Sequence, residues 1–409
     1  MKVVLGLSVA LALAAPLARA QAPVDPVAVL VKQLELEKYK ATIKGLTRFG
    51  DRRQGTERNR QALDWIEAQL KSYGCTNTER LQYQFTQPAP GAPAPKRAPG
   101  IPGGGAGGPP GQGGSTLFGN RIPTGVNTDP MRQPDERLRA LNAEQTPVGT
   151  SLRENVYCTK IGTTHPEEMY IVSAHMDGIG FGEAANDDGS GTALVMELAR
   201  IFSMPGVETD RSIRFILWNN EETGLNGAAA YVEQRKDLQG IESPKGSGKY
   251  PEPKWLGMIQ HDMMMYDHGM PIPKVGADGK TTYVSPPEQR LEADVNIEYQ
   301  SVSKQAEGSA RLAWAFRAAN DKYATNYPAA VGFHMTNTDS TPFMDLVPSI
   351  SLRENERGQQ IGAGWNPNWH QPTDNYDTYS DKDFLLGLNA AQTTLAGVAQ
   401  LAGVRIIKK

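Results

Sequence analysis

The fold of this chain is decided by residues 170–200, which read YIVSAHMDGIGFGEAANDDGSGTALVMELAR. The opening residues of this stretch are apolar and partly β-branched, which is typical of a buried strand. A glycine-rich loop follows, and the apolar residues after Asp188 recur with the spacing of a helix. The pattern predicts a strand, a loop and a helix, with His175, Asp177 and Asp187 as candidate metal-site residues between the two elements.

Strands and helices alternate through the C-terminal part of the chain. Apolar runs predict buried strands, and amphipathic spacing predicts helices. This alternation is typical of a mostly parallel sheet with helices on both faces. We therefore expect an α/β fold with a mixed, mostly parallel central sheet in a single domain. The expected strands are 169–174, 212–218, 255–260 and 347–352, and the expected helices are 192–202, 225–238, 303–323 and 381–401.

The N-terminal part is expected to contribute two helices to this domain. Apolar spacing predicts a helix over 24–49 with a break near Gly45, and a second helix over 52–73 that stops at Gly74. Gly and Pro are the residues that most often interrupt or end a helix, which is why the break is placed at Gly45.

Two cysteines are present, Cys75 and Cys158, which is too few for a disulfide scaffold or a cysteine zinc site. Alternating apolar residues predict strands over 78–85 and 155–161. If these strands pair antiparallel, the start of the first lies beside the end of the second, and the cysteines become neighbours. A disulfide between them is therefore favoured over two separate buried thiols.

Residues 87–114 are low-complexity sequence rich in Pro, Gly and Ala, which predicts a disordered or extended loop. We expect this loop to interrupt one domain, so that 24–86 supply its helices and first strand and 115–409 the remainder. Within the remainder, a helical piece is expected at 135–142, and 267–299 is expected to be an irregular insertion with room for a hairpin.

Residues 1–20 are expected to be a signal peptide, because Lys2 precedes an apolar run that ends in the small-x-small sequence 18–20. No later run is apolar for long enough to span a membrane. The protein is therefore expected to be exported, to the periplasm or the extracellular space. The net charge of −3 becomes about −5 without Lys2 and Arg19, which argues against a nucleic-acid or anionic-membrane partner.

Potential metal ligands recur where the predicted strands end. In open α/β sheets, ligands bind beyond the carboxyl ends of the strands. His175 follows one strand, Glu221 and Glu222 another and Asp262 a third, while His370 lies in the loop after the fourth. Taken singly, each motif could also be a solvated turn, a surface pair or a helix start. Their repetition at one edge of one sheet favours a metal site.

Spacing gives two of these motifs a chemical reading. Residues two apart in extended chain face the same way, so Asp177 can accept a hydrogen bond from the His175 ring nitrogen that does not bind metal. Adjacent Glu221 and Glu222 can share a site only where the backbone turns, as expected at Gly224. One glutamate can then bind metal while the other serves as a general base.

In combination, these motifs resemble the co-catalytic di-zinc exopeptidases of metallopeptidase family 28, the aminopeptidase Y-like group. The segment FGDRRQGTERN (49–59) also resembles the N-terminal part of that family. Two departures are visible, small residues in place of the usual glycine-alanine before Asp187, and His261 beside Asp262. The motifs that carry the resemblance are AHMD (174–177), AANDDGSG (184–191), NEETGLNGA (220–228), IQHDMMMYD (259–267) and WHQPTDNYDT (369–378).

The resemblance implies a single catalytic domain with two zinc ions, a peptide substrate and hydrolysis of the N-terminal peptide bond by a zinc-bound water. It also implies a role for each matching residue. Asp187 bridges the ions, His175 and Asp262 complete one site, Glu222 and His370 complete the other, Glu221 is the general base, Asp177 orients His175, and the 187–188 peptide bond is cis.

Other functions remain open from the sequence. The same fold serves carboxypeptidases or dipeptidases, glutaminyl cyclases, and binding homologues that have lost catalysis. A complete ligand set argues against a single-zinc cyclase and against a damaged site. Recognition of a free amine calls for an acidic residue near the site, and Asp339 in TNTDSTPF (336–343) is the candidate.

Overall fold

The computed structural model describes residues 24–89, 126–266, 272–279, 281–284, 295–333, 335, 338–354, 366 and 368–407. The expected signal peptide and residues 90–114 of the expected low-complexity loop lie outside the described residues. No helix within the described ranges is both long and apolar enough to cross a membrane.

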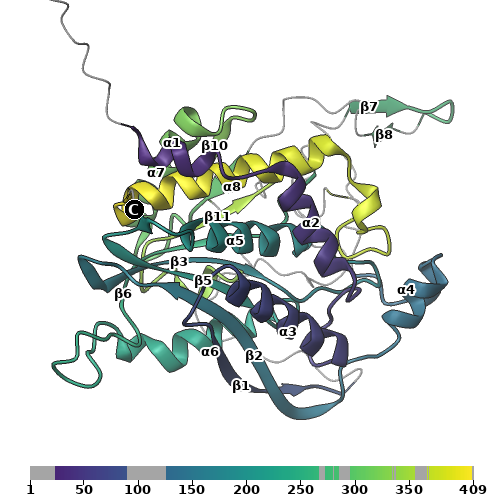
Figure 1. Cartoon of the computed structure of the whole chain (residues 1–409). Helices are drawn as coiled ribbons and strands as arrows, with labels where there is room; N and C mark the ends of the chain where they lie inside the picture. Colours follow the sequence, from purple (N-terminus) through teal and green to yellow (C-terminus); the bar gives the residue numbers. More distant parts are fainter. Residues whose placement is uncertain are drawn as a thin grey trace, which may run out of the picture.

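A mixed sheet in the order β1-β2-β5-β3-β6-β11-β9-β10 forms the centre of the molecule (Figure 1). Its middle strands β5, β3, β6 and β11 are parallel, so their carboxyl ends meet at one edge. Antiparallel pairs β1–β2, β2–β5 and β9–β11 flank them. The strands are β1 (Glu79–Gln87), β2 (Gly149–Lys160), β3 (His165–His175), β5 (Arg211–Trp218), β6 (Lys254–His261), β9 (Val295–Glu298), β10 (Ala329–Gly332) and β11 (Ser349–Arg353).

Helices cover both faces of this sheet, as predicted. In Figure 1, α5 and α8 cross the face toward the viewer with α2 and α3 beside them, and α6 lies below with β1 and β2. The α-helices are α1 (Pro26–Val31), α2 (Leu36–Thr47), α3 (Glu57–Ser72), α4 (Glu136–Leu141), α5 (Gly189–Phe202), α6 (Asn226–Arg235), α7 (Ala306–Tyr323) and α8 (Asp381–Ala402).

The smaller elements lie outside the main sheet. Two strand pairs, β4–β12 and β7–β8, are antiparallel. Short 3-10 helices mark several turns. These elements are β4 (Val207–Glu208), β7 (Ile272–Val275), β8 (Thr281–Val284), β12 (Arg405–Ile406), η2 (Pro130–Arg132), η3 (Lys236–Leu238), η4 (Thr341–Phe343) and η5 (Tyr376–Thr378).

Strand β5 shows how the sheet separates two hydrophobic cores. Ile213 and Phe215 point into the larger core, beneath the helices α2, α5, α7 and α8. Ile216 and Trp218 point the other way, into the smaller core beneath α6. Side chains of a strand alternate between faces, so a strand buried on both sides must be apolar throughout. This explains why the sequence SIRFILW is nearly continuous in apolar residues.

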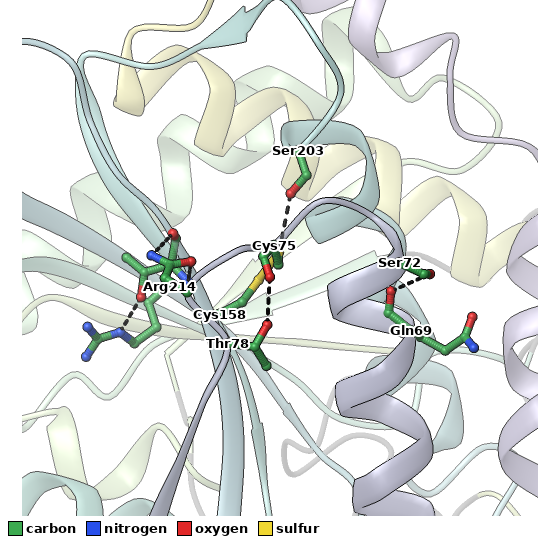
Figure 2. Close-up of a disulfide and its surroundings, with 9 residues drawn as sticks. Gln69, Ser72, Cys75, Thr78, Cys158, Ser203 and Arg214 are labelled. Carbon is green, nitrogen blue, oxygen red and sulfur yellow. Dashed lines mark hydrogen bonds between the residues drawn. A yellow bond between two sulfur atoms is a disulfide. The ribbon is translucent and has the colours of Figure 1, made fainter.

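The cysteines lie where the antiparallel pairing of β1 and β2 places them. Glu79 pairs with Tyr157, which confirms the predicted pairing of these strands. Cys75 and Cys158 form a disulfide that ties the end of α3 to β2 (Figure 2). Ser203 contacts Cys75 with 3.3 Å between its hydroxyl oxygen and the sulfur, so the end of α5 packs on the same bridge.

Two expectations about secondary structure are wrong. The break near Gly45 is absent, since α2 runs through Gly45 and the chain turns at residues 32–35. A Cβ at Gly45 would lie 2.5 Å from the Trp65 ring, so this glycine permits close packing of α2 on α3. The expected insertion 267–299 does contain a hairpin, but its last part is strand β9 of the main sheet.

Candidate metal centre

The predicted metal-site residues come together at the carboxyl edge of the parallel strands. Strand β3 ends at His175, and the turn after β5 carries Glu221 and Glu222. Asp262 follows β6, Asp187 lies just before α5, and His370 lies in the turn 368–375 after β11. Because the parallel strands all end at this edge, it brings together side chains that are far apart in the sequence.

Asp187 lies between two imidazoles. Its Oδ1 is 3.2 Å from Nε2 of His175, and its Oδ2 is 3.0 Å from Nε2 of His370. The two oxygens of this carboxylate therefore face different histidines. All three side chains are buried.

The remaining ligand candidates extend this arrangement on either side. Asp262 Oδ1 is 3.8 Å from His175 Nε2, and Glu222 Oε2 is 2.9 Å from His370 Nε2. Two sets of possible ligand atoms lie within 4.8 Å of one another, His175–Asp187–Glu222 and His175–Glu221–Asp262. The second set includes Glu221, to which the family resemblance gives the role of general base.

The contact of Asp177 with His175 differs in one detail from the expectation. The Nδ1 of His175 lies 3.0 Å from the backbone oxygen of Asp177 and 3.9 Å from its carboxylate Oδ1. The carboxylate instead accepts the backbone N–H of Glu221 at 3.0 Å. Asp177 thus contacts the imidazole through its main chain and holds the turn that carries Glu221 through its side chain.

Asp188 ties three parts of the edge together. Its carboxylate accepts the N–H of Gly191 at 2.9 Å, which caps α5, and the N–H of His175 at 3.1 Å. It also accepts the N–H of Met263 at 3.2 Å, one residue after Asp262. The peptide bond between Asp187 and Asp188 is cis.

Asp374 connects the turn that carries His370 to the residues around Asp187. Its carboxylate accepts the backbone N–H groups of Asn186 at 2.9 Å and Asp187 at 3.1 Å. The Tyr379 hydroxyl donates to the same group. The sequence contained Asp374 only as one position of the WHQPTDNYDT motif (369–378), and nothing in the spacing assigned it this role.

Arg52 holds the loop between His175 and Asp187, a role that the sequence did not indicate. Its Nε donates to the carbonyl of Met176 at 2.7 Å, and its terminal nitrogens donate to Glu183 at 2.8 Å and Ala184 at 2.7 Å. The guanidinium is completely buried. One side chain therefore grips both ends of the loop 176–184 (the glycine loop), which joins two ligand candidates.

The end of strand β11 and the residue after it supply more buried contacts. Arg353 Nη2 lies 3.3 Å from Oδ2 of Asp262, opposite the oxygen that faces His175. Glu354 accepts the N–H groups of Met265 and Tyr266 and the side-chain amide of Asn186. These contacts fix the chain after Asp262 against the residue before Asp187.

His261 and Asp339 are not positioned to contact a substrate. His261 is fully buried, with Nδ1 2.9 Å from the Ser173 carbonyl and Nε2 2.8 Å from the Thr394 hydroxyl. Asp339 is also fully buried, and its Oδ2 accepts from Gln260 at 3.4 Å. The suggestion that Asp339 binds a free amine directly therefore does not fit its burial.

The charges of the site explain its shifted pKa values. Burial lowers the pKa of His370, but Glu222 and Asp187 outweigh burial and raise it to about 10. Burial raises the pKa of the Glu221 carboxyl well above its usual range; His175 opposes this, and Asp339 and Glu222 add to it. Crowded carboxylates of this kind favour any positive charge placed among them.

The residues fit a pair of zinc ions. Oε1 of Glu222 and Oδ2 of Asp177 are buried without a hydrogen-bond partner in the structure, and buried polar atoms are rarely left so. Imidazole and carboxylate donors suit Zn²⁺, and a site with carboxylate bridging can hold two ions. Glu222 would ligate through the oxygen that faces His370, or through its unpartnered one.

The chain resembles known peptidases in sequence. It is 45% identical over 75 residues to aminopeptidase YwaD of Bacillus subtilis, which is 18% of this chain and 16% of that protein. It is 34% identical over 89 residues to carboxypeptidase Q of Xenopus laevis, covering 22% of this chain and 19% of that protein. The similarity therefore spans less than a fifth of the length of these two relatives.

A third relative is similar over a longer range at lower sequence identity. The chain is 27% identical over 252 residues to the probable lipoprotein aminopeptidase LpqL of Mycobacterium tuberculosis, covering 60% of this chain and 44% of that protein.

Solved structures share the fold. An aminopeptidase from Aneurinibacillus sp. strain AM-1 superposes with a TM-score of 0.57 at 19% identity, covering 94% of this chain and 97% of that one. A zinc aminopeptidase from Bacillus subtilis gives a TM-score of 0.56 at 15% identity, covering 92% and 97%. These likenesses establish the architecture.

The family assignment comes from the profile of Peptidase family M28, which matches residues 155–393. The matched range covers more than half of the chain and contains every ligand candidate. This protein is therefore a member of peptidase family M28.

Proposed function

We propose that this protein is an exported di-zinc aminopeptidase that hydrolyses the N-terminal peptide bond of peptides. The observation that carries the proposal is the placement of Asp187, whose two oxygens face the Nε2 atoms of His175 and His370 at 3.2 and 3.0 Å. A carboxylate shared in this way suits a bridging ligand. His175 and Asp262 would then hold one ion, and Glu222 and His370 the other.

The residues of the chain divide the work of hydrolysis. Bound zinc ions would lower the pKa of the attacking water and polarise the substrate carbonyl. Glu221 would take the proton of that water and pass it to the leaving amine. Burial and neighbouring carboxylates raise the pKa of Glu221, which strengthens it as a proton acceptor. Asp177 holds the Glu221 backbone in place.

The acidity of the site favours an amine-bearing substrate end. Besides the ligand candidates, the carboxylates of Asp177, Glu221 and the fully buried Asp339 add negative charge near the centre, and this charge would attract an α-ammonium group even though Asp339 is too buried to contact it. The main alternative is a carboxypeptidase or dipeptidase of the same fold, since the similar proteins carry both kinds of name.

Substitution of each of the adjacent glutamates by glutamine tests the mechanism. Glu221→Gln should bind about two zinc ions per chain and lose roughly 10²- to 10⁴-fold in kcat, because it removes a base and no ligand. Glu222→Gln is the adjacent control and should lose zinc. Inductively coupled plasma mass spectrometry measures the zinc content, and hydrolysis of amino-acid p-nitroanilides measures kcat. Loss of zinc in Glu221→Gln would mean that the roles of the glutamates are exchanged.

Substrate ends are tested with matched pairs of free and N-acetylated peptides. Cleavage of free peptides at the first bond supports an aminopeptidase. Cleavage of acetylated peptides alone, at the last bond, would replace the proposal with a carboxypeptidase.

A further inference from the structure

Residues 126–142, here called the strap, lie across the loops that carry the metal ligands. The strap contains η2 and α4 and belongs to the connection between β1 and β2. It precedes residues 155–393, the range that the family profile matches. The contacts of the strap therefore come from a segment outside the range that the family profile matches.

Side-chain amides of the strap bind three successive carbonyls of the glycine loop. Asn127 Nδ2 donates to Gly180 at 3.2 Å, Gln133 Nε2 donates to Phe181 at 2.8 Å, and Asn142 Nδ2 donates to Gly182 at 2.8 Å. All three amide side chains are buried. A run of three carbonyls bound in register fixes the path of the glycine loop.

The strap also binds the turn that carries His370. The backbone N–H of Asn127 donates to the His370 carbonyl at 3.0 Å. The Nε2 of Gln133, which already binds Phe181, also donates to the carbonyl of Pro372 at 2.9 Å. One buried amide group therefore joins the glycine loop to the His370 turn.

Gln133 is itself held at both ends. Its Oε1 accepts the N–H of Asp135 at 3.1 Å, and its backbone carbonyl accepts from Arg139 of α4. Only 1% of the residue is exposed. A fixed amide has little freedom to follow a moving partner, so the two loops are kept at a set separation.

We propose that the strap is a positioning element for the zinc centre, and that Gln133 is its central positioning residue. The proposal rests on the proposed di-zinc function. His370 belongs to one ligand pair only, so loosening its turn affects the ion held by Glu222 and His370 first. The ion held by His175 and Asp262 depends on the strand ends of β3 and β6, whereas the hydrogen bonds of Asn127, Gln133 and Asn142 described above go to the glycine loop and the His370 turn.

Gln133→Met tests the proposal, because methionine has a similar length and volume but no amide N–H. Replacing groups that orient ligands weakens metal binding by about 10- to 100-fold, and an effect near the lower end is expected because Gln133 acts through backbone. Stepwise zinc dissociation constants are measured on the full chain by competition with a chromogenic chelator. One constant should rise roughly tenfold, and the other should stay within about twofold.

Gln145→Met is the matched control. Gln145 also lies in the β1–β2 connection, but its amide donates only to carbonyls of residues 142–144. Both zinc constants of this variant should equal those of the wild type. Asn127→Asp is a second test, which removes the amide donor to the carbonyls of Gly180 and Asp129 and should weaken the same ion by a smaller factor.

The outcomes separate this proposal from the proposed function. Two zinc ions in the wild type with unchanged constants in Gln133→Met and Asn127→Asp would overturn the strap and leave the di-zinc function standing. Equal weakening of both ions would overturn it too, because a general loss of structure acts on both. Fewer than two zinc ions in the wild type would refute the di-zinc function itself.

Discussion

The two halves of the candidate zinc centre are built by different means. His175 ends β3 and pairs in register with Trp218 of β5, and Asp262 follows directly on β6. His370 and the turn before Glu222 lie in irregular chain, where His370 and Asn220 have φ angles of 55° and 67°. The half with His175 and Asp262 is held by hydrogen bonds of the sheet. The half with Glu222 and His370 is held by hydrogen bonds from side chains that lie far away in the sequence to its backbone.

This difference shows where the site is robust and where it is adjustable. A ligand at the end of a central strand cannot move without disturbing the core. A ligand in a turn moves when a few hydrogen bonds change, since loops open at lower free energy than core strands. We therefore expect substitutions around the turn-borne half to alter zinc binding with little loss of fold, and substitutions behind the strand-borne half to reduce stability first.

Arg52→Met should give the largest effect, because Arg52 grips the loop that joins the halves. The change removes donors to the carbonyls of Met176, Glu183 and Ala184. It also takes a buried positive charge away from nearby carboxylates, which include Asp374 and Asp51. Loss of one partner in such a buried network costs about 3–5 kcal/mol of unfolding free energy. Urea unfolding of the zinc-loaded protein measures it, and both zinc ions should weaken together.

Arg48→Met is the control for losing an arginine at a neighbouring position. Arg48 is exposed, so its replacement should change the unfolding free energy by less than about 1 kcal/mol. Equal stability of the two variants would show that the Arg52 contacts do not hold the glycine loop.

The strand-borne half should be sensitive to acid through His261. Burial lowers the pKa of His261 to about 4, from the ordinary 6.5. Between these values the unfolded chain takes up a proton that the folded chain refuses, so stability is full above pH 6.5 and declines as the pH falls toward 4. The shift corresponds to about 3 kcal/mol.

The measurement is the free energy of unfolding between pH 7 and 4, with chelator present so that zinc does not contribute. In His261→Asn the amide can still donate to the Ser173 carbonyl but cannot ionise in this range. Its stability should be lower at pH 7, and its decline with acid should be smaller by about 3 kcal/mol. If the free energy of unfolding declined equally in both proteins, His261 would not be a source of the acid sensitivity.

The strand-borne half is also the part that the sequence revealed. The apolar run before His175 and the SIRFILW strand could be recognised because strands buried on both faces have a simple pattern. Strands β9 and β10 were not expected, since each has only four residues and no periodic signal. The ligand candidates were found through their motifs, without knowledge of the turns that hold them.

What the sequence could not show is the set of side chain–backbone contacts around the second half. Arg52, Gln133 and Asp374 bind carbonyls or N–H groups far away in the chain. A backbone carbonyl has no residue type, so no motif or spacing reports that a particular side chain will reach it. The helix break expected at Gly45 was wrong for a related reason, since the decisive neighbour is the ring of Trp65 on another helix, which local spacing does not report.

Gly180→Ala should sharpen the comparison through a selective effect on zinc binding. Gly180 has φ of +100°, and a Cβ there would lie 2.4 Å from the carbonyl carbon of His370. Gly149→Ala is a matched control, since Gly149 has φ of +104° with nothing within 4 Å. Gly149→Ala should lose about 1–2 kcal/mol through backbone strain, and Gly180→Ala should lose more, because it must also displace the His370 turn. We therefore expect Gly149→Ala to keep two zinc ions and Gly180→Ala to keep one. If Gly180→Ala retained both ions at wild-type affinity, the turn-borne half would be as rigid as the strand-borne half, and the distinction between them would fail.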